Sequence, residues 1–255
     1  MKKRSNSVLT PPVVLCFSGH DPTGGAGIQA DSEAIAAMGC HAVSVITCLT
    51  VQDTHNVYSL KPLDVAYILQ QAQVILSDIN ISAIKIGLLG SCEIVEALIT
   101  ILDECPDIPV VFDPVLAAGG GTSLAKSELL CCIQDQLLGR VSLVTPNVPE
   151  AEILPIFDGK CKNILLTGTH DESTEGVINR LIIDGLEVSA LSWSRLADTY
   201  HGSGCTLASA VAAGLAKGLS LLEAVEIAQK YTWESLSQAR KISDGQLIPL
   251  RKGFT

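Results

Sequence analysis

The feature that most constrains the fold is a regular alternation of short apolar runs with longer amphipathic segments. The apolar runs are 13–17, 42–48, 81–86, 108–112, 141–145 and 164–167. Helical periodicity marks the segments 26–38, 63–76, 92–102, 124–138, 206–215 and 222–239. Uniformly apolar strands that alternate with helices indicate a parallel sheet covered on both faces. We therefore expect an α/β chain with three layers, α/β/α, and a mostly parallel central sheet.

Two segments depart from this alternation. Residues 180–183 and 186–193 are two strand-like runs joined by Asp184-Gly185, a pair that suits a type I′ turn, so we expect an antiparallel edge hairpin. The stretch between Glu150 and Ile164 is too short for a full crossover helix with its loops.

Composition excludes several classes of protein. The 255 residues are 47% hydrophobic and carry a formal net charge of −10. A disordered chain has less apolar content, and a nucleic-acid-binding surface needs an excess of Lys and Arg. No apolar stretch approaches the ~20 residues of a membrane helix. The apolar run near the start is broken by Ser5-Asn6-Ser7 and Pro11-Pro12, unlike a signal peptide. We expect a cytoplasmic protein with a flexible tail over 1–12 and one domain over 13–255.

The nine cysteines are odd in number and irregularly spaced, with no Cys-x-x-Cys pair. This pattern does not indicate a disulfide framework or a zinc site. We expect eight of them to be buried thiols that pack as small hydrophobic groups. Cys205 is set apart by its position in a glycine-rich loop.

Glycine-rich and polar loops follow the predicted strands. In open α/β sheets, ligands bind beyond the carboxyl ends of the strands, so these loops predict a small-molecule site on one rim. The segment 202–206 (GSGCT) opens a predicted helix, whose free N–H groups and positive dipole end suit an anion. In an acidic protein, a phosphate site has to use such backbone groups and a metal ion.

Two other readings of these loops are weaker. Gly25-x-Gly27-x-x-Ala30 matches the dinucleotide pattern, but residues 18–24 separate it from the strand and no acidic residue ends the second strand. Cys205 with His201 or His20 could serve an acyl-transfer hydrolase, but no orienting Asp is evident nearby.

Six segments, in order along the chain, carry a resemblance to the hydroxymethylpyrimidine/phosphomethylpyrimidine kinases of thiamine biosynthesis, members of the ribokinase-like superfamily. The segments are 18–31 (SGHDPTGGAGIQAD), 45–52 (VITCLTVQ), 85–87 (KIG), 113–115 (DPV), 145–151 (TPNVPEA) and 201–207 (HGSGCTL). The resemblance implies a ribokinase-like fold and a homodimer. It also implies ATP- and Mg²⁺-dependent phosphorylation of 4-amino-5-hydroxymethyl-2-methylpyrimidine and then of its monophosphate.

The resemblance also implies roles for individual residues. The pyrimidine pocket would be lined by Gly19, Asp31, Gln52, Leu88 and Val115. The anion hole and catalytic group would be Gly202, Gly204 and Cys205. ATP and its phosphates would bind at Asn147, Glu150, Thr167 and Ser203. Asp113 and Glu150 would bind Mg²⁺, in part indirectly.

Cys205 is informative because other ribokinase-like enzymes, which resemble this chain in the arrangement of their motifs, carry Asp at that position. A helix N-terminus lowers the pKa of a thiol, so Cys205 could take the proton of an alcohol. A phosphate monoester, with a second pKa of ~6, is already mostly dianionic and would be repelled by a carboxylate. We hypothesise that a thiol able to stay neutral suits a site that accepts both nucleophiles.

Two departures from the family concern the nucleotide side. Similar enzymes usually have a Lys where this chain has Thr167, before His170, and Lys162 or Arg195 is an alternative source of that charge. The segment after Glu150 is also short by about one helix. Besides the pyrimidine kinase, the sequence leaves open a pyridoxal-type kinase and a non-catalytic pyrimidine-binding protein with a degraded nucleotide site.

Overall fold

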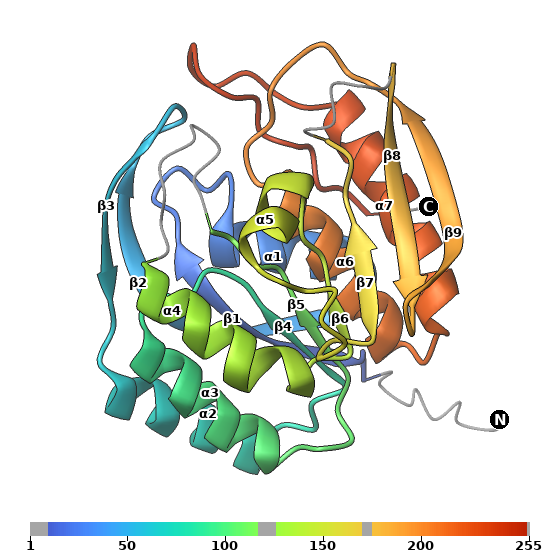
Figure 1. The fold of residues 1–255 in the computed structure, drawn as a ribbon. Helices are drawn as coiled ribbons and strands as arrows, with labels where there is room; N and C mark the ends of the chain where they lie inside the picture. The colour runs from blue at the N-terminus through green and yellow to red at the C-terminus, as the bar shows by residue number, and fades with distance from the viewer. Residues whose placement is uncertain (1–9, 117–125, 170–174, 254–255) are drawn as a thin grey trace, which may run out of the picture.

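One sheet runs through the molecule between two layers of helices (Figure 1). The computed structural model describes residues 10–116, 126–169 and 175–253. Its nine strands, in the spatial order β3-β2-β1-β4-β5-β6-β7-β8-β9, are β1 Val13–His20, β2 His41–Gln52, β3 Val57–Pro62, β4 Ala83–Ile86, β5 Val110–Phe112, β6 Leu143–Val144, β7 Asn163–Leu166, β8 Gly176–Ile183 and β9 Leu186–Ser194. The α-helices are α1 Gly27–Ala37, α2 Val65–Asp78, α3 Cys92–Asp103, α4 Ser127–Cys132, α5 Val148–Ile153, α6 Ser203–Ala216 and α7 Leu221–Ser237.

The six inner strands, β2, β1, β4, β5, β6 and β7, are parallel, which confirms the predicted ribokinase-like fold class. The predicted edge hairpin is confirmed as β8–β9, and its turn residues Asp184 and Gly185 have φ values of 48° and 78°. A second antiparallel edge was not predicted. There β2 continues past residue 48 and turns back into β3, because the Asp53 carboxylate accepts the N–H groups of His55 and Asn56 and closes the turn.

Two hydrophobic cores lie on the two faces of the sheet. On β1, Leu15 and Phe17 point to the core under α2, α3 and α4, whereas Val14 and Cys16 point to the core under α1, α6 and α7. Strands whose alternate side chains are all apolar are what a sheet covered on both faces requires.

The helices differ in detail from the sequence-based expectation. The described part of the helix expected over 124–138 begins at α4 and continues through a π-helical turn, Ile133–Leu137, and a 3-10 turn, Leu138–Arg140. The parallel strands β6 and β7 are connected only by the six-residue helix α5, which contains Glu150, before β7 begins at Asn163. This agrees with the short segment noted in the sequence.

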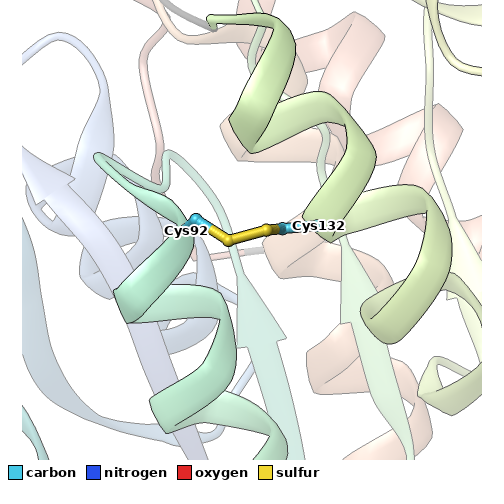
Figure 2. The surroundings of a disulfide bond; sticks show 2 residues. All are labelled: Cys92 and Cys132. Carbon is cyan, nitrogen blue, oxygen red and sulfur yellow. A yellow bond between two sulfur atoms is a disulfide. The ribbon is translucent and has the colours of Figure 1, made fainter.

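The cysteines correct the expectation that eight were buried thiols. Cys92 and Cys132 form a disulfide between the first residue of α3 and the last residue of α4 (Figure 2), and Cys131 is exposed. The two bonded residues are 40 positions apart, with a Cα–Cα distance of 5.7 Å. Only the packing of α3 beside α4 brings them together, so their spacing in the sequence carried no sign of the bond.

None of the helices in the described part of the chain is both long and apolar enough to cross a bilayer. Most of the predicted N-terminal tail, residues 1–9, lies outside the described residues, as do residues 117–125 and His170.

Candidate functional site

The start of α6 lies at the carboxyl rim of the sheet, and we call it the α6 corner. Its N-cap, Gly202, has a left-handed φ of 74°, and a Cβ there would overlap the carbonyl oxygen of Gly25. Thr206 N–H makes the first intrahelical bond, to Gly202 O at 3.0 Å. The N–H groups of Ser203, Gly204 and Cys205 precede that bond and have no carbonyl within the helix. With no acidic residue in the first turn of α6, the corner suits a phosphate.

Arg251 ties this corner to the glycine-rich loop after β1. Its buried guanidinium donates to Gly25 O at 2.6 Å, to Thr206 Oγ1 at 2.8 Å and to Glu33 Oε2 at 3.1 Å. The C-terminal segment therefore holds together two loops that are far apart in the sequence. Sequence analysis gave Arg251 no role.

Two acidic side chains lie beside the corner. A Cβ on Gly204 would lie 3.4 Å from Asp113 Oδ1, so that carboxylate faces the start of α6. Glu150 is the third residue of α5, and its carboxylate accepts the Asn147 N–H at 2.9 Å while Asn147 Oδ1 accepts the Glu150 N–H at 2.9 Å. This capping box orients Glu150 toward the rim.

Burial disfavours the charged form of both carboxyl groups. Burial, with the nearby Asp113 charge, raises the pKa of Glu150 to about 8. Burial also raises the pKa of Asp113 to about 6, although the Lys85 ammonium opposes the shift. Asp113 Oδ2 is buried with no hydrogen-bond partner in the described structure. A cation bound between these two carboxyl groups would favour their ionised forms and lower both pKa values.

The described residues contain no group of three or more His, Cys, Asp or Glu side chains arranged to hold a metal ion. A cation here would therefore depend on Asp113, Glu150 and groups supplied by a ligand. Mg²⁺ is commonly bound in this way, by one or two carboxylates plus substrate phosphates.

Thr167 lies at the end of β7, where it pairs as a parallel bridge with Asn147. Its hydroxyl donates to Pro146 O at 3.3 Å, so it brings no positive charge to the rim. Of the two cations considered as substitutes, Lys162 precedes β7 and so lies at the opposite end of that strand. Arg195 lies on the correct side, where it donates to Thr169 O at 2.7 Å.

The structure brings together only some of the residues predicted to line the pyrimidine pocket. A Cβ on the buried Gly19 would lie 3.1 Å from Leu88 Cδ2, so these two residues are neighbours. Gln52 ends β2 and is half-buried, with its Nε2 3.3 Å from His201 Nε2. Val115 lies two residues beyond Asp113, after the end of β5.

The structure gives Asp31 a different environment from the pocket wall that was expected for it. Its side chain has no exposed surface and forms a buried ion pair, with Lys85 Nζ 2.8 Å from Oδ1. Ser209 donates to Oδ1 at 2.8 Å and Ser18 to Oδ2 at 2.6 Å. With both oxygens occupied, Asp31 lies behind the rim and does not present a surface to a ligand. Lys85, a charge within the apolar strand 83–86, was the sequence signal for this partner.

Cys205 also differs from expectation, because burial raises the pKa of its thiol to about 12 and the Asp113 charge adds to the effect against that of Lys85. The Asp113 carboxylate lies near enough to the thiol for each group to influence the pKa of the other. The predicted lowering by the helix N-terminus is therefore wrong, since desolvation of the buried thiolate outweighs it. Cys205 stays neutral at pH 7, so it is a poor general base.

An Asp–His pair that sequence analysis missed joins the first glycine-rich loop to the loop before α6. Asp21 Oδ2 lies 2.9 Å from His201 Nε2. The hydrolase reading lacked an orienting Asp, and Asp21 occupies that place, but no hydrogen bond joins the Cys205 thiol to the imidazole in the described structure, and burial raises the thiol pKa to about 12. Asp21 belongs to the first glycine-rich loop, and the sequence analysis considered His201 only as a partner of Cys205.

Two surface hollows lie at the other end of the strands, near their amino ends. One, of about 480 Å³, is lined by residues at the start of β1 and just before β4. The other, of about 400 Å³, is lined by residues of α2 and by residues that precede β4 and β5. Neither contains the charged and backbone groups of the carboxyl rim, so we place the functional site at that rim on chemical grounds.

Comparison with known proteins identifies the family. The family model described as phosphomethylpyrimidine kinase matches residues 21–249. The chain belongs to the phosphomethylpyrimidine kinase family. It is 32% identical to the hydroxymethylpyrimidine/phosphomethylpyrimidine kinase of Haemophilus influenzae, over 91% of this chain and 93% of that protein. It is 36% identical to the chloroplastic thiamine biosynthetic bifunctional enzyme TH1 of Arabidopsis thaliana, over 94% of this chain but only 49% of that protein. The chain thus spans about half the length of this plant relative.

Solved structures agree with the family assignment. The phosphomethylpyrimidine kinase of Clostridium difficile 630 has a TM-score of 0.74 and 30% identity, covering 86% of this chain and 97% of that one. The pyridoxal kinase of Bacillus subtilis, solved as an ADP complex, has a TM-score of 0.87 at 24% identity and covers 96% of this chain and 98% of that one. The second likeness shows the shared fold.

Proposed function

We propose that this chain transfers a phosphoryl group from ATP to 4-amino-5-hydroxymethyl-2-methylpyrimidine, and then to the resulting monophosphate. The observation that carries the proposal is the α6 corner. There, the free N–H groups of Ser203, Gly204 and Cys205 lie beside the Asp113 carboxylate, on the same rim as Gly19 and Leu88. Membership of the phosphomethylpyrimidine kinase family supports the substrate class.

The α6 corner suits phosphoryl transfer because this reaction needs little covalent chemistry from the protein. Backbone N–H groups bind the oxygens of the transferring phosphoryl group and stabilise charge as it redistributes. Cys205 is neutral and does not repel a second phosphate. The monophosphate is mostly dianionic at pH 7 because its second pKa is ~6, so it attacks without a base.

Mg²⁺ fits the acidic pair. Asp113 Oδ2 has no hydrogen-bond partner in the described structure, and burial raises the pKa of both carboxyls, so a divalent cation would displace their protons and give Oδ2 a partner. We propose that Asp113 and Glu150 hold the ion, with Asn147 fixing Glu150 through the capping box. The ion would neutralise the ATP phosphates, a role the net charge of −10 leaves few side chains to perform.

A coupled ADP-release assay with the pyrimidine alcohol, its monophosphate and pyridoxal tests the proposal. We expect turnover with both pyrimidines and slower turnover with pyridoxal. Glu150→Gln should lower kcat by roughly a hundredfold, since catalytic charge stabilisation is worth that much. Glu152→Gln, an exposed residue on the same helix, is the matched control and should retain activity. Absence of ADP release with either pyrimidine would overturn the proposal.

A pyridoxal-type kinase is the second candidate. The pyridoxal kinase of Staphylococcus aureus, solved with pyridoxal, is 25% identical with a TM-score of 0.85. Pyridoxal also presents a ring that carries a hydroxymethyl group. Turnover of pyridoxal faster than of either pyrimidine would favour this candidate.

A third candidate is a non-catalytic pyrimidine-binding protein, suggested by Thr167 at the position where similar enzymes usually have a Lys. Such a protein would bind the pyrimidine but release no ADP at any Mg²⁺ concentration. The homodimer and the cytoplasmic location implied by the resemblance stay proposals.

A further inference from the structure

We propose that Arg251 and Thr206 are positioning residues for phosphoryl transfer: they fix the first turn of α6, so that its backbone N–H groups stay aimed at the transferring phosphoryl group. The inference rests on the proposed function, which places that group at the α6 corner. Neither residue belongs to the groups that were expected to contact the substrate, ATP or Mg²⁺. Arg251 reaches the α6 corner from the C-terminal segment, 45 positions along the chain from Thr206.

The first turn of α6 has little support of its own. Gly202 is its N-cap and Gly204 its second residue, and glycine is among the least favourable residues within a helix. The helices α5 and α7 both begin with a capping box, whereas the N-cap of α6 makes no side-chain hydrogen bond to its first turn. Such a cap would also occupy N–H groups that a phosphate needs. The turn therefore has to be held in a way that leaves these N–H groups available.

Thr206 holds the turn through an acceptor. Its buried hydroxyl donates to Gly202 O at 2.7 Å, and its N–H donates to the same oxygen at 3.0 Å. A hydroxyl has one donor and two acceptor sites. Because the hydroxyl proton is used on Gly202 O, Thr206 Oγ1 is the acceptor of the bond from Arg251 Nε, at 2.8 Å. A charged donor polarises this hydroxyl and strengthens the bond that it makes to the N-cap.

Arg251 joins this turn to the loop after β1. Its side chain has no exposed surface, and Nη2 donates to Gly25 O at 2.6 Å while Nη1 pairs with Glu33 Oε2 at 3.1 Å. A Cβ on Gly202 would lie 2.9 Å from Nη2, so the guanidinium packs directly against the N-cap. A guanidinium is a planar group whose N–H donors have fixed directions. It therefore sets the distance and the angle between the loop after β1 and the start of α6.

The consequence is that the α6 corner is held without using its own donors. Each of these bonds ends on a carbonyl, hydroxyl or carboxylate oxygen, and none uses an N–H group of Ser203, Gly204 or Cys205. Such donors stabilise developing charge best when they already point to where it develops. A misplacement of about 1 Å can lower a rate roughly a hundredfold. Two residues that touch neither substrate nor ATP thus help to determine the rate of transfer.

The test compares two quantities for the pyrimidine alcohol: the single-turnover rate constant of phosphoryl transfer, and the dissociation constant measured by calorimetry without ATP. Thr206→Val keeps the branched shape but removes the hydroxyl. We expect its rate constant to fall roughly tenfold, while the dissociation constant changes less than about twofold. Thr206→Ser retains a hydroxyl and should keep the rate constant within about twofold of the wild-type value. Circular dichroism first shows that each variant is folded at the assay temperature.

Thr232→Val is the matched control. Thr232 is also buried and donates its hydroxyl to the carbonyl oxygen four residues earlier, that of Ala228, at 2.7 Å. It lies on α7, and no arginine donates to it in the described structure. Its rate constant should stay within about twofold of the wild-type value, which separates a weakened helix from a misplaced α6 corner.

Arg251→Lys is the second variant and decides the matter if Thr206→Val does not fold. A lysine keeps the charge but lacks the planar group, so it cannot hold Gly25 O and Thr206 Oγ1 in the same geometry. We expect the rate constant to fall roughly tenfold, with the dissociation constant of the alcohol changed less than about twofold.

A wild-type rate constant in Thr206→Val, or an equal loss in Thr232→Val, would overturn the inference. Weaker binding of the alcohol in proportion to the lost rate would overturn it too, since that indicates a loosened fold rather than misplaced donors. If wild-type protein turns over the alcohol and both Thr206→Val and Arg251→Lys match it, only the positioning role fails. If wild-type protein releases no ADP with either pyrimidine, the proposed function fails and the positioning role fails with it.

Discussion

At the scale of single residues, Cys205 shows how burial reverses a rule read from local sequence. A helix N-terminus lowers the pKa of a thiol, yet burial raises the pKa of this one to about 12. The part of the hypothesis that still holds is that the Cys205 side chain is neutral. A neutral group beside Asp113 adds no further negative charge to a corner that has to receive phosphate.

Cys205→Asp would add that charge. We expect its kcat/KM to fall roughly tenfold more for the monophosphate than for the alcohol, because the monophosphate carries the larger negative charge. Steady-state assays with both substrates measure the two values. Cys205→Ser, which stays neutral, is the control and should leave their ratio unchanged. An unchanged ratio in Cys205→Asp would contradict the hypothesis.

Asp21 predicts a pH dependence of stability. Its folded pKa lies below its unfolded value, so its contribution is present above the ordinary pKa of ~3.9 and is lost as pH falls toward the folded pKa. The free energy of unfolding of the wild type minus that of Asp21→Asn should stay constant from about pH 5 to 8 and shrink below about pH 4. Urea titrations across this range measure it. A difference that grows on acidification would contradict the assigned charge.

At the scale of elements, the rim depends on one buried arginine that links α6, the loop after β1 and the C-terminal segment. Arg251→Ala would leave Gly25 O without its 2.6 Å donor and Thr206 Oγ1 without its 2.8 Å donor. Losing one partner of a buried charged network should lower the free energy of unfolding by about 3 kcal/mol. Chemical denaturation measures the loss.

The exposed Arg240 provides the control, since Arg240→Ala should cost less than about 0.5 kcal/mol, as surface substitutions usually do. Equal effects of the two substitutions would show that Arg251 does not hold the loops.

The disulfide between α3 and α4 gives a second prediction at this scale. Cross-linking residues separated by 40 positions should stabilise the oxidised protein by about 4 kcal/mol through the entropy of the unfolded chain. Comparing the melting temperatures of oxidised protein and of Cys132→Ala measures the effect. Peptide mapping without reduction should recover a linked Cys92–Cys132 peptide, and recovery of both residues as free thiols would contradict the bond.

At the scale of the whole molecule, the net charge of −10 opposes the binding of anions. Screening this repulsion should lower the KM for the monophosphate about twofold between roughly 20 and 200 mM NaCl. The KM for the neutral alcohol should stay constant, so the two substrates control for each other. A KM for the monophosphate that rises with salt would show that the local field of the α6 corner dominates over the net charge.

Much of the fold was predictable because it depends on local patterns. The parallel inner strands, the β8–β9 hairpin at Asp184-Gly185 and the short crossover around Glu150 all followed from apolar runs, turn residues and segment length. The β2–β3 edge was missed because β3 is short, at Val57–Pro62, and none of its residues is buried, so it lacks the alternation of a half-buried strand.

The sequence by itself determined the α/β fold class, the rim on which glycine-rich loops gather and, through its motifs, the kinase family. Only the tertiary structure decided which groups are charged and which meet. Asp31 is paired with Lys85, Asp21 with His201 and Cys92 with Cys132, across separations the sequence does not mark. Backbone patterning is local and can be read residue by residue. Burial and pairing depend on what surrounds an atom in space, and they set the protonation of Asp113, Glu150 and Cys205.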